Sequence, residues 1–172
     1  VGNGLTGTLA DYSGRIAGFT GTGGVSELTV RGSVSTGVAI TGEYTADTHA
    51  GRFALDYQAI HDTPASLELT AGVWSFSAAS SGGLIYTAVW EIDETGAVFG
   101  TDTAGCVLVG NIGVGDPLVN TYAVSVQVDS CGYFDGGYAG LAFLGSAGGQ
   151  ARNSLTVSMA NDVFAYAVTL QR

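Results

Sequence analysis

The chain has 172 residues, a length that fits one domain or at most two small ones and allows a substantial core. It contains no lysine, and five arginines against fifteen acidic residues leave a net charge of −10. This charge repels a polyanion such as nucleic acid and also an anionic membrane surface. No segment approaches the roughly 18 consecutive apolar residues of a membrane-spanning helix. The composition therefore predicts a globular protein that binds neither nucleic acid nor a membrane.

Glycine accounts for 28 of the 172 residues, against a usual share of roughly 7 %. The glycines lie between short alternating runs, where a compact β-protein needs turns and bulges. In the first such run, residues 1–12, Leu5 and Leu9 share one face, and we expect an edge or detachable strand. Further short strands are predicted in this part of the chain at residues 15–20, 28–34, 38–44 and 52–60.

The segment of residues 61–65 is the one linker-like stretch in the middle of the chain. Pro64 lacks a backbone N–H and pushes Thr63 toward an extended conformation. The segment is interpreted as a corner within one all-β domain, residues 1–172, or as a boundary between sub-units 1–62 and 63–172. Because proline suits the first position of a helix, a helical turn at residues 64–70 is an alternative to an extended strand there.

The rest of the chain alternates more cleanly. In the run that starts at Ile85, Tyr86, Ala88, Trp90 and Ile92 share one face. Strands are predicted near residues 72–79, 85–93, 97–101, 106–114, 120–131, 138–145, 154–160 and 163–171. The whole chain is thus predicted to be all-β, an antiparallel meander of about twelve short strands closed into a β-barrel or a sandwich.

The two cysteines, Cys106 and Cys131, are expected to form a disulfide, because the composition is typical of a secreted protein and the sequence has no His- or Cys-rich cluster. The bond would close a loop of about 26 residues and contribute about 3 kcal/mol. Two free buried thiols are the alternative. A disulfide, together with a first residue Val1 rather than methionine, favours a processed extracellular, cell-surface or periplasmic protein.

The acidic residues have two interpretations: solubility, or a divalent-cation site. Asp93, Glu94 and Asp102 lie in successive turns, and at one end of the meander they would form a weak calcium site or flank a sugar. The alternative is that the aspartates start their turns by accepting backbone N–H bonds, with Gly96 and Gly105 as the last turn residues.

Four aromatic side chains, Trp74, Tyr86, Trp90 and Phe99, are expected in the interior of a barrel, either as core or around a small apolar ligand or sugar. A second group, Tyr133, Phe134, Asp135 and Tyr138, follows Cys131 and forms either a recognition loop or a cap on the sheet.

Catalytic signals are weak. His49 and His61 lie in predicted loops without another ligand at metal-binding spacing, and no Gly-x-Ser-x-Gly motif stands between a strand and a helix. We expect no catalytic residue, no metal and no cofactor.

Residues 66–172 contain Gly72-Val73-Trp74, a Gly-x-Asp-x-x-Gly-Cys turn that ends at Cys106, Asn120-Thr121-Tyr122, and Cys131. In these motifs the segment resembles a family of small bacterial exported β-proteins and lipoproteins. It implies export and a β-fold, and Val1 stands where a lipid-anchored member has its cysteine. The Trp-bearing strand followed by a meander is also loosely similar to calycins such as lipocalins and avidins.

These observations predict a non-catalytic extracellular or cell-envelope protein with a structural or interaction role. Its partner would be a second copy or an envelope protein, and residues 1–10 would serve in strand addition within a surface assembly. A barrel that binds a small ligand or sugar, and a periplasmic inhibitor of an enzyme, are the alternatives.

Overall fold

The computed structural model describes residues 3–11, 26–46, 49–79, 85–148 and 150–172. Contacts between residues divide the chain into two compact units: Val1–Ala59 with Asp162–Phe164, and Ile60–Asn161 with Ala165–Arg172. The main boundary falls at the start of the short 3-10 helix η1, Ala59–Asp62, which leads into the segment that contains Pro64. The strand predicted at residues 15–20 lies outside the described residues.

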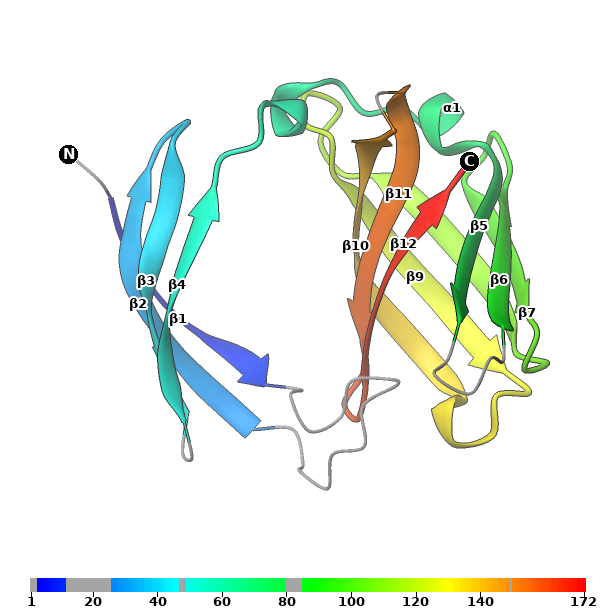
Figure 1. Ribbon diagram of the computed structural model, residues 1–172, viewed down its shortest axis with the longest axis horizontal. Coiled ribbons are helices and arrows are strands. Elements are labelled where there is room, and N and C mark those ends of the chain that lie inside the picture. Colours follow the sequence, from blue (N-terminus) through cyan, green and yellow to red (C-terminus); the bar gives the residue numbers. More distant parts are fainter. Residues whose placement is uncertain (1–2, 12–25, 47–48, 80–84, 149) are drawn as a thin grey trace. The chain divides into compact units, whose positions relative to one another are not determined.

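The first unit is an open antiparallel sheet with the strand order β1-β2-β3-β4 (Figure 1, blue to cyan). Its strands are β1 (Asn3–Asp11), β2 (Ser26–Ser35), β3 (Ala39–Thr45) and β4 (Ala50–Asp56). A φ of 67° at Gly37 permits the tight turn between β2 and β3. β4 ends four residues earlier than its sequence predicts, because its last residue pairs with Ala39, the first residue of β3. Beyond that point one further backbone bond, from the Tyr57 N–H to the Val38 carbonyl at 2.8 Å, joins the two segments.

Strand alternation gives this sheet two different faces. One carries apolar side chains from every strand, and register places Leu9 opposite Leu28 and Val34 opposite Ile40. The other carries Thr, Ser and charged side chains, such as Arg31 opposite Glu43. A sheet with one apolar face is stable when another element packs against that face.

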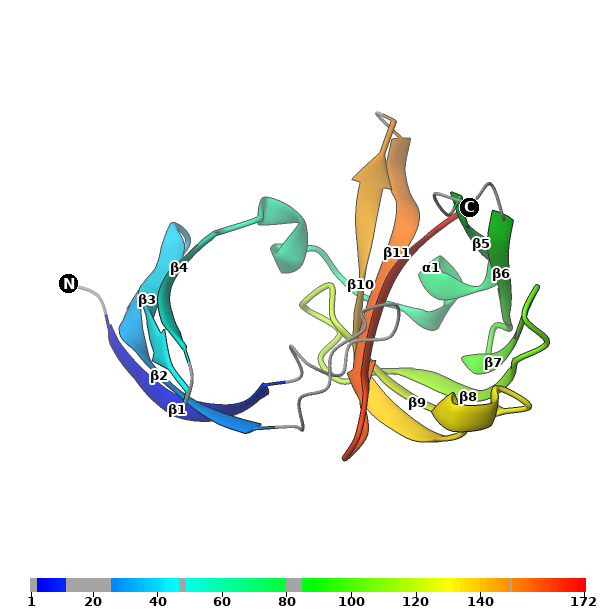
Figure 2. The same ribbon diagram turned by 60° about the horizontal axis from the view of Figure 1, so that its bottom comes forward.

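The second unit is a closed antiparallel barrel of eight strands in sequence order, which confirms the predicted all-β meander and its closure (Figures 1 and 2). The strands are β5 (Gly72–Ala79), β6 (Ile85–Ile92), β7 (Ala97–Asp102), β8 (Val107–Val114), β9 (Tyr122–Asp129), β10 (Gly136–Ala147), β11 (Gln150–Ala160) and β12 (Ala165–Gln171). Together with the first unit the described residues form twelve strands.

Closure of the barrel is uneven. Neighbours in sequence, such as β5 and β6, pair along most of their length, whereas β12 and β5 pair only through Gln171 and Ser75. The Ser75 hydroxyl adds a 3.4 Å hydrogen bond to the Gln171 carbonyl. The first and last strands are thus joined at one place.

Inward residues of the barrel form a continuous apolar core. Tyr122, Leu144, Leu155, Val157 and Leu170 have no exposed surface. One glycine makes room for a tryptophan: Gly100 lies opposite Trp90 across β6 and β7, and a Cβ there would stand 2.9 Å from Trp90 Cδ1. Large and small residues in facing positions let the interior fill without voids.

Two asparagines complete the backbone pairing of β10. The buried Asn120 donates to the Leu144 carbonyl at 2.6 Å and accepts from the Leu144 N–H at 3.2 Å. Asn153 makes the same pair of bonds with Ala147, at 2.9 and 2.7 Å, where the ladder between β10 and β11 shifts register. Each amide side chain makes the pair of hydrogen bonds that the backbone of a neighbouring strand residue would otherwise make.

Candidate functional site

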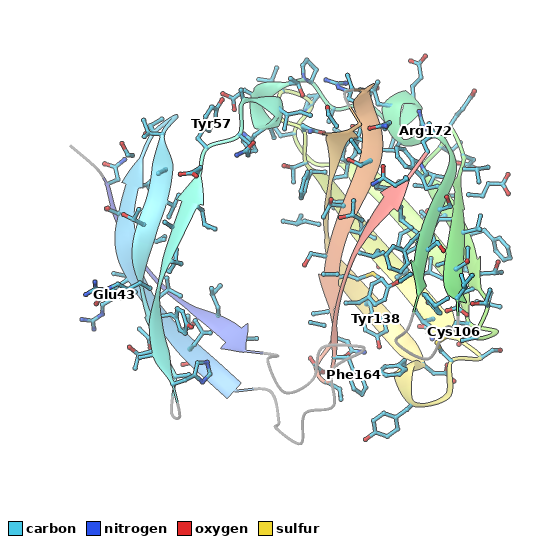
Figure 3. All side chains as sticks on the ribbon, viewed as in Figure 1. Glu43, Tyr57, Cys106, Tyr138, Phe164 and Arg172 are labelled. Carbon is cyan, nitrogen blue, oxygen red and sulfur yellow. A yellow bond between two sulfur atoms is a disulfide. The ribbon has the colours of Figure 1, made fainter. Side chains whose placement is uncertain are left out.

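One end of the barrel is closed by the short helix α1, Leu67–Thr70. The sequence left open a helical turn at residues 64–70 as an alternative to an extended strand, and the structure contains this helical turn. The Trp74 indole N–H donates to the Thr70 carbonyl at 2.7 Å, and the Tyr122 hydroxyl donates to the Ser66 carbonyl at 3.3 Å. Arg172 lies at the same end (Figure 3), with its guanidinium carbon 4.3 Å from the centre of the Trp74 ring. This end of the barrel is therefore tied to the helix by side chains.

Three of the four aromatic residues predicted for the barrel interior point inward. Trp74 is fully buried, Trp90 is nearly so, and Tyr86 is half-buried. The prediction is wrong for Phe99, which is 52 % exposed on the outer face. Strand alternation explains this: inward residues Val98 and Gly100 flank it, and β7 carries large residues on both faces.

The core side chains around Trp74 leave no water-sized space beside them, because a fully buried side chain has no surface that a water molecule reaches. Eight strands enclose an interior just wide enough for side chains or one small ligand. In the half of the barrel around Trp74, side chains fill this interior. Half-buried inward side chains, including Phe76 and Tyr166, lie toward the other end.

At that other end, Tyr86 and Asp102 form a polar pair. The Tyr86 hydroxyl donates to Asp102 Oδ2 at 2.7 Å, and Tyr166 is hydrogen-bonded to Tyr86. Burial raises the pKa of Tyr86 far above its usual range, and the bond to Asp102 raises it further. Burial also raises the pKa of Tyr166. Both phenols therefore stay protonated at neutral pH.

The same Asp102 fixes the turn that carries the disulfide. Its Oδ1 accepts the backbone N–H groups of Ala104 and Cys106, at 2.8 and 3.0 Å. Asp93 does the same in its own turn, where its Oδ1 accepts from Thr95 at 2.8 Å and from Ala97 at 2.9 Å. The Thr95 hydroxyl is the largest cause that lowers the pKa of Asp93. The turn interpretation of these aspartates is therefore confirmed.

The prediction of a weak calcium site formed by Asp93, Glu94 and Asp102 is wrong. Asp93 and Glu94 precede β7, whereas Asp102 ends it, and successive turns of an antiparallel meander lie at opposite ends of the strands. A strand rises about 3.3 Å per residue, so roughly 20 Å separates the two turns. Within the described part of the chain, the one group of three metal-ligating side chains is Asp102, Cys106 and Cys131. Because the cysteines are oxidised, they offer no thiolate to a metal.

The disulfide between Cys106 and Cys131 is confirmed, with 4.5 Å between its Cα atoms. It joins the turn before β8 to the segment after β9, at the end of the barrel where Figure 3 labels Cys106 and Tyr138. Asp135 supports the second cysteine, because its carboxylate accepts the Cys131 N–H at 2.6 Å. Both cysteine N–H groups are thus held by aspartates.

The predicted recognition loop separates into buried and exposed residues. Tyr138 is buried, and its hydroxyl donates to the Phe134 carbonyl at 3.0 Å, so it belongs to the core and not to a recognition surface. The Asp135 carboxylate accepts the hydrogen bond from the Cys131 N–H. Tyr133 is 77 % exposed and its ring meets that of Phe134 edge to face. Tyr133 and Phe134 lie within the 3-10 helix η2 (Gly132–Phe134), and they and Asp135 are exposed.

Both histidines are exposed. His61 is exposed and lies 2.8 Å from the carboxylate of its neighbour Asp62. His49 is exposed in the first unit, where its ring meets Tyr44 edge to face.

The first unit presents an unpaired strand edge. β1 pairs with β2 at every position from Asn3 to Asp11. Among the described residues no strand pairs with its other side. Of the predicted residues 1–10, Asn3 to Ala10 are thus part of an edge strand of their own sheet and not a detached segment. No residue from Asn3 to Ala10 is charged, and none is proline.

A shallow hollow lies on the same sheet, where Gly32 and Gly42 stand opposite each other on β2 and β3. Its charged residues, Arg52 and Glu43, form an exposed ion pair at 3.2 Å. Since these charges neutralise each other, the hollow presents no single charge to a ligand.

The sequence did not lead us to predict one exposed apolar surface of the barrel. Val73, Val89, Phe99 and Val109 point outward from β5, β6, β7 and β8 and are exposed. The signal was present, because these strands place large apolar residues on both faces: Val73 precedes Trp74, and Phe99 follows Val98.

No family model, curated protein or solved structure matches the chain. No helix in the described residues is long and apolar enough to span a membrane. The fold defines the class of protein: a disulfide-linked antiparallel β-barrel that carries an additional four-stranded sheet.

Proposed function

We propose that this protein is a non-catalytic interaction protein of the cell exterior or envelope, and that it self-assembles by strand addition. In this proposal the barrel is a rigid scaffold and the four-stranded sheet is the assembling part. The outer edge of β1 pairs with the same edge of a second copy. The observation that carries the proposal is that this edge is long and uncharged and that no other described strand pairs with it.

An open edge of this kind is unusual, because soluble proteins protect edge strands with lysine, proline, bulges or covering segments. β1 pairs with β2 in an unbroken register over nine residues, so its backbone is already extended for a further partner. Its first charged residue is Asp11, at the end of the strand. The opposite edge strand, β4, carries Arg52 and Asp56. We therefore assign assembly to β1 and not to β4.

Charge distribution supports contact through the sheet. Residues 1–59 hold five acids and three arginines, a net charge of −2, whereas residues 60–172 hold ten acids and two arginines, a net charge of −8. Two copies repel each other most strongly through the barrel unit and least through the sheet. Pairing through β1 also extends the apolar face of the sheet, which carries Leu5 and Leu9 at this edge.

The location outside the cytoplasm is supported by the disulfide between Cys106 and Cys131, since such bonds persist in oxidising compartments. The acidic, lysine-free composition fits a protein that keeps away from anionic surfaces.

The test is the mass of the protein in solution, followed by sedimentation over a range of concentrations. Wild type is expected to be a dimer, and Thr6→Lys with Thr8→Lys, which places two cations on the β1 edge, is expected to be a monomer. The matched control is Thr29→Lys with Thr41→Lys, which adds the same charge to the same face of the central strands β2 and β3. The control should remain a dimer. A wild-type protein that is monomeric at all concentrations contradicts the proposal.

A barrel that binds a small ligand is the second candidate, and one observation bears on where it would bind. Because core side chains fill the half of the barrel next to α1, such a ligand would sit beside Tyr86 and Tyr166 at the disulfide end. Both phenols are already hydrogen-bonded there, which favours the interaction function over this one.

A further inference from the structure

The outer surface of the barrel is not uniform around its circumference. Outward residues of β9, β11 and β12 are small or polar, as in a barrel that faces water: Ser125 and Gln127, Thr156 and Ser158, Ala167 and Thr169. The outward residues of β5 to β8 include instead Val73, Val89, Phe99 and Val109, with exposed fractions of 57, 39, 52 and 50 %. We call these four residues, with Glu91, the outer stripe.

Strand register shows that the outer stripe is continuous. Glu91 lies directly opposite Val73 on β5 and directly opposite Phe99 on β7. Phe99 in turn lies opposite Val109 on β8. Side chains directly opposite in a sheet have Cβ atoms about 5 Å apart, and diagonal neighbours such as Val89 and Phe99 lie within about 8 Å. The outer stripe is therefore one patch with a carboxylate at its centre.

The four strands around that carboxylate carry no basic residue. The strands β5 to β8 contain no arginine, and the chain contains no lysine. Glu91 is exposed and is the one charged residue that points outward from these four strands. A contiguous exposed apolar patch in a soluble protein marks an interaction site. An uncompensated acid inside it selects a cationic partner group.

We propose that the outer stripe binds a protein segment that carries one arginine among aliphatic or aromatic side chains. The guanidinium bonds to both oxygens of Glu91 and stacks on the ring of Phe99, while the apolar side chains cover Val73, Val89 and Val109. This inference goes beyond the proposed assembly, because it concerns the barrel and not the β1 edge. A second copy is the poorer occupant, since both copies would bring Glu91 and residues 60–172 with their net charge of −8.

The proposal is tested with a displayed library of random 12-residue peptides, selected on the full-length oxidised protein. We expect selected peptides to share an arginine flanked by apolar residues. For one such peptide, Glu91→Gln should weaken binding at least about tenfold, and Phe99→Ser should do the same. The matched control is Phe143→Ser, since Phe143 on β10 is 47 % exposed on the outer face but lies opposite Thr156, away from the outer stripe. It should bind like wild type.

Charge reversal gives a second readout. Glu91→Arg should abolish binding of the arginine peptide and accept the same peptide with its arginine replaced by glutamate. Selected peptides without a cation, or peptides that bind Phe99→Ser as tightly as wild type, overturn the proposal. A lower solution mass for Phe99→Ser than for wild type would also overturn it, because the outer stripe would then be an interface between copies. Equal melting temperatures of the variants exclude misfolding as the cause of lost binding.

Discussion

The guanidinium of Arg172 lies 4.3 Å above the ring of Trp74, and its Nη2 donates to two carbonyls of the α1 region, Leu69 at 3.3 Å and Ala71 at 2.6 Å. These carbonyls belong to the end of a helix, where no further turn supplies a backbone N–H donor. Trp74 is itself bonded to Thr70. One cation thus links the end of the last strand to the helix that closes the barrel and to the first tryptophan of the core.

We expect Arg172→Ala to lower the free energy of unfolding by about 1–3 kcal/mol, since it removes a cation over an aromatic face and two hydrogen bonds. Urea unfolding followed by tryptophan fluorescence measures the change. The control is Arg52→Ala, which breaks an ion pair whose two side chains are 86 and 67 % exposed. A pair so exposed contributes little, and the control should stay within about 0.5 kcal/mol of wild type.

Asn120→Ala should be more damaging than its size suggests. The amide of Asn120 satisfies both backbone groups of Leu144, and all of these atoms are buried. Without it the N–H and the carbonyl lose their partners, at a cost of about 2–4 kcal/mol. Asn111→Ala, on the exposed face of β8, is the comparison and should be nearly neutral in the same urea titration. Equal effects of the two substitutions would contradict this account.

Two glycines of β10 should respond differently to alanine. A Cβ at Gly140 would overlap with the Ser158 carbonyl oxygen and stand 2.5 Å from the Met159 Cα, so the backbone of β11 would have to move. We expect Gly140→Ala to cost at least about 2 kcal/mol. At Gly137 the nearest atom is 3.6 Å away, and Gly137→Ala should change stability by less than about 0.5 kcal/mol. Thermal unfolding of the two variants checks this difference.

Reduction of the disulfide should destabilise the barrel by about 3 kcal/mol, because the bond restricts a loop of the unfolded chain. The double variant Cys106→Ser with Cys131→Ser should unfold at the same denaturant concentration as the reduced wild type. Added dithiothreitol should not change its midpoint further. A wild-type midpoint that is the same with and without the reductant would show that the bond contributes nothing.

Stability should fall at high pH, and Tyr86 should account for part of the fall. Its pKa is raised in the folded protein, so above pH 10, near the ordinary pKa of tyrosine, the unfolded chain releases a proton that the folded protein keeps. This favours unfolding as the pH rises, by at most about 1.4 kcal/mol per pH unit for one such group. Tyr86→Phe should make the slope shallower in urea titrations between pH 9 and 11.5. Phe143→Leu, which has no ionising group, should keep the wild-type slope.

Local pattern determined much of the fold. The alternation in the strand that starts at Ile85 placed Tyr86, Ala88, Trp90 and Ile92 on the inner face, and they are there. The Asp-x-x-Gly turns and the Cys106–Cys131 bond also followed from the residues. These features depend on neighbours in sequence, on the period of a strand, or on the presence of only two cysteines.

Other features depend on which strands meet, and only the tertiary structure decided them. Strand period assigns Phe99 a face but does not say which face is inside, because Val98 is equally apolar. The separation of Asp93 from Asp102 and the burial of Tyr138 follow from the barrel's two ends. Closure through Gln171 and Ser75, almost a hundred residues apart, leaves no local signal. The residues determined strand periods and turns, whereas long-range pairing decided that eight strands close into a barrel and that four form an open sheet.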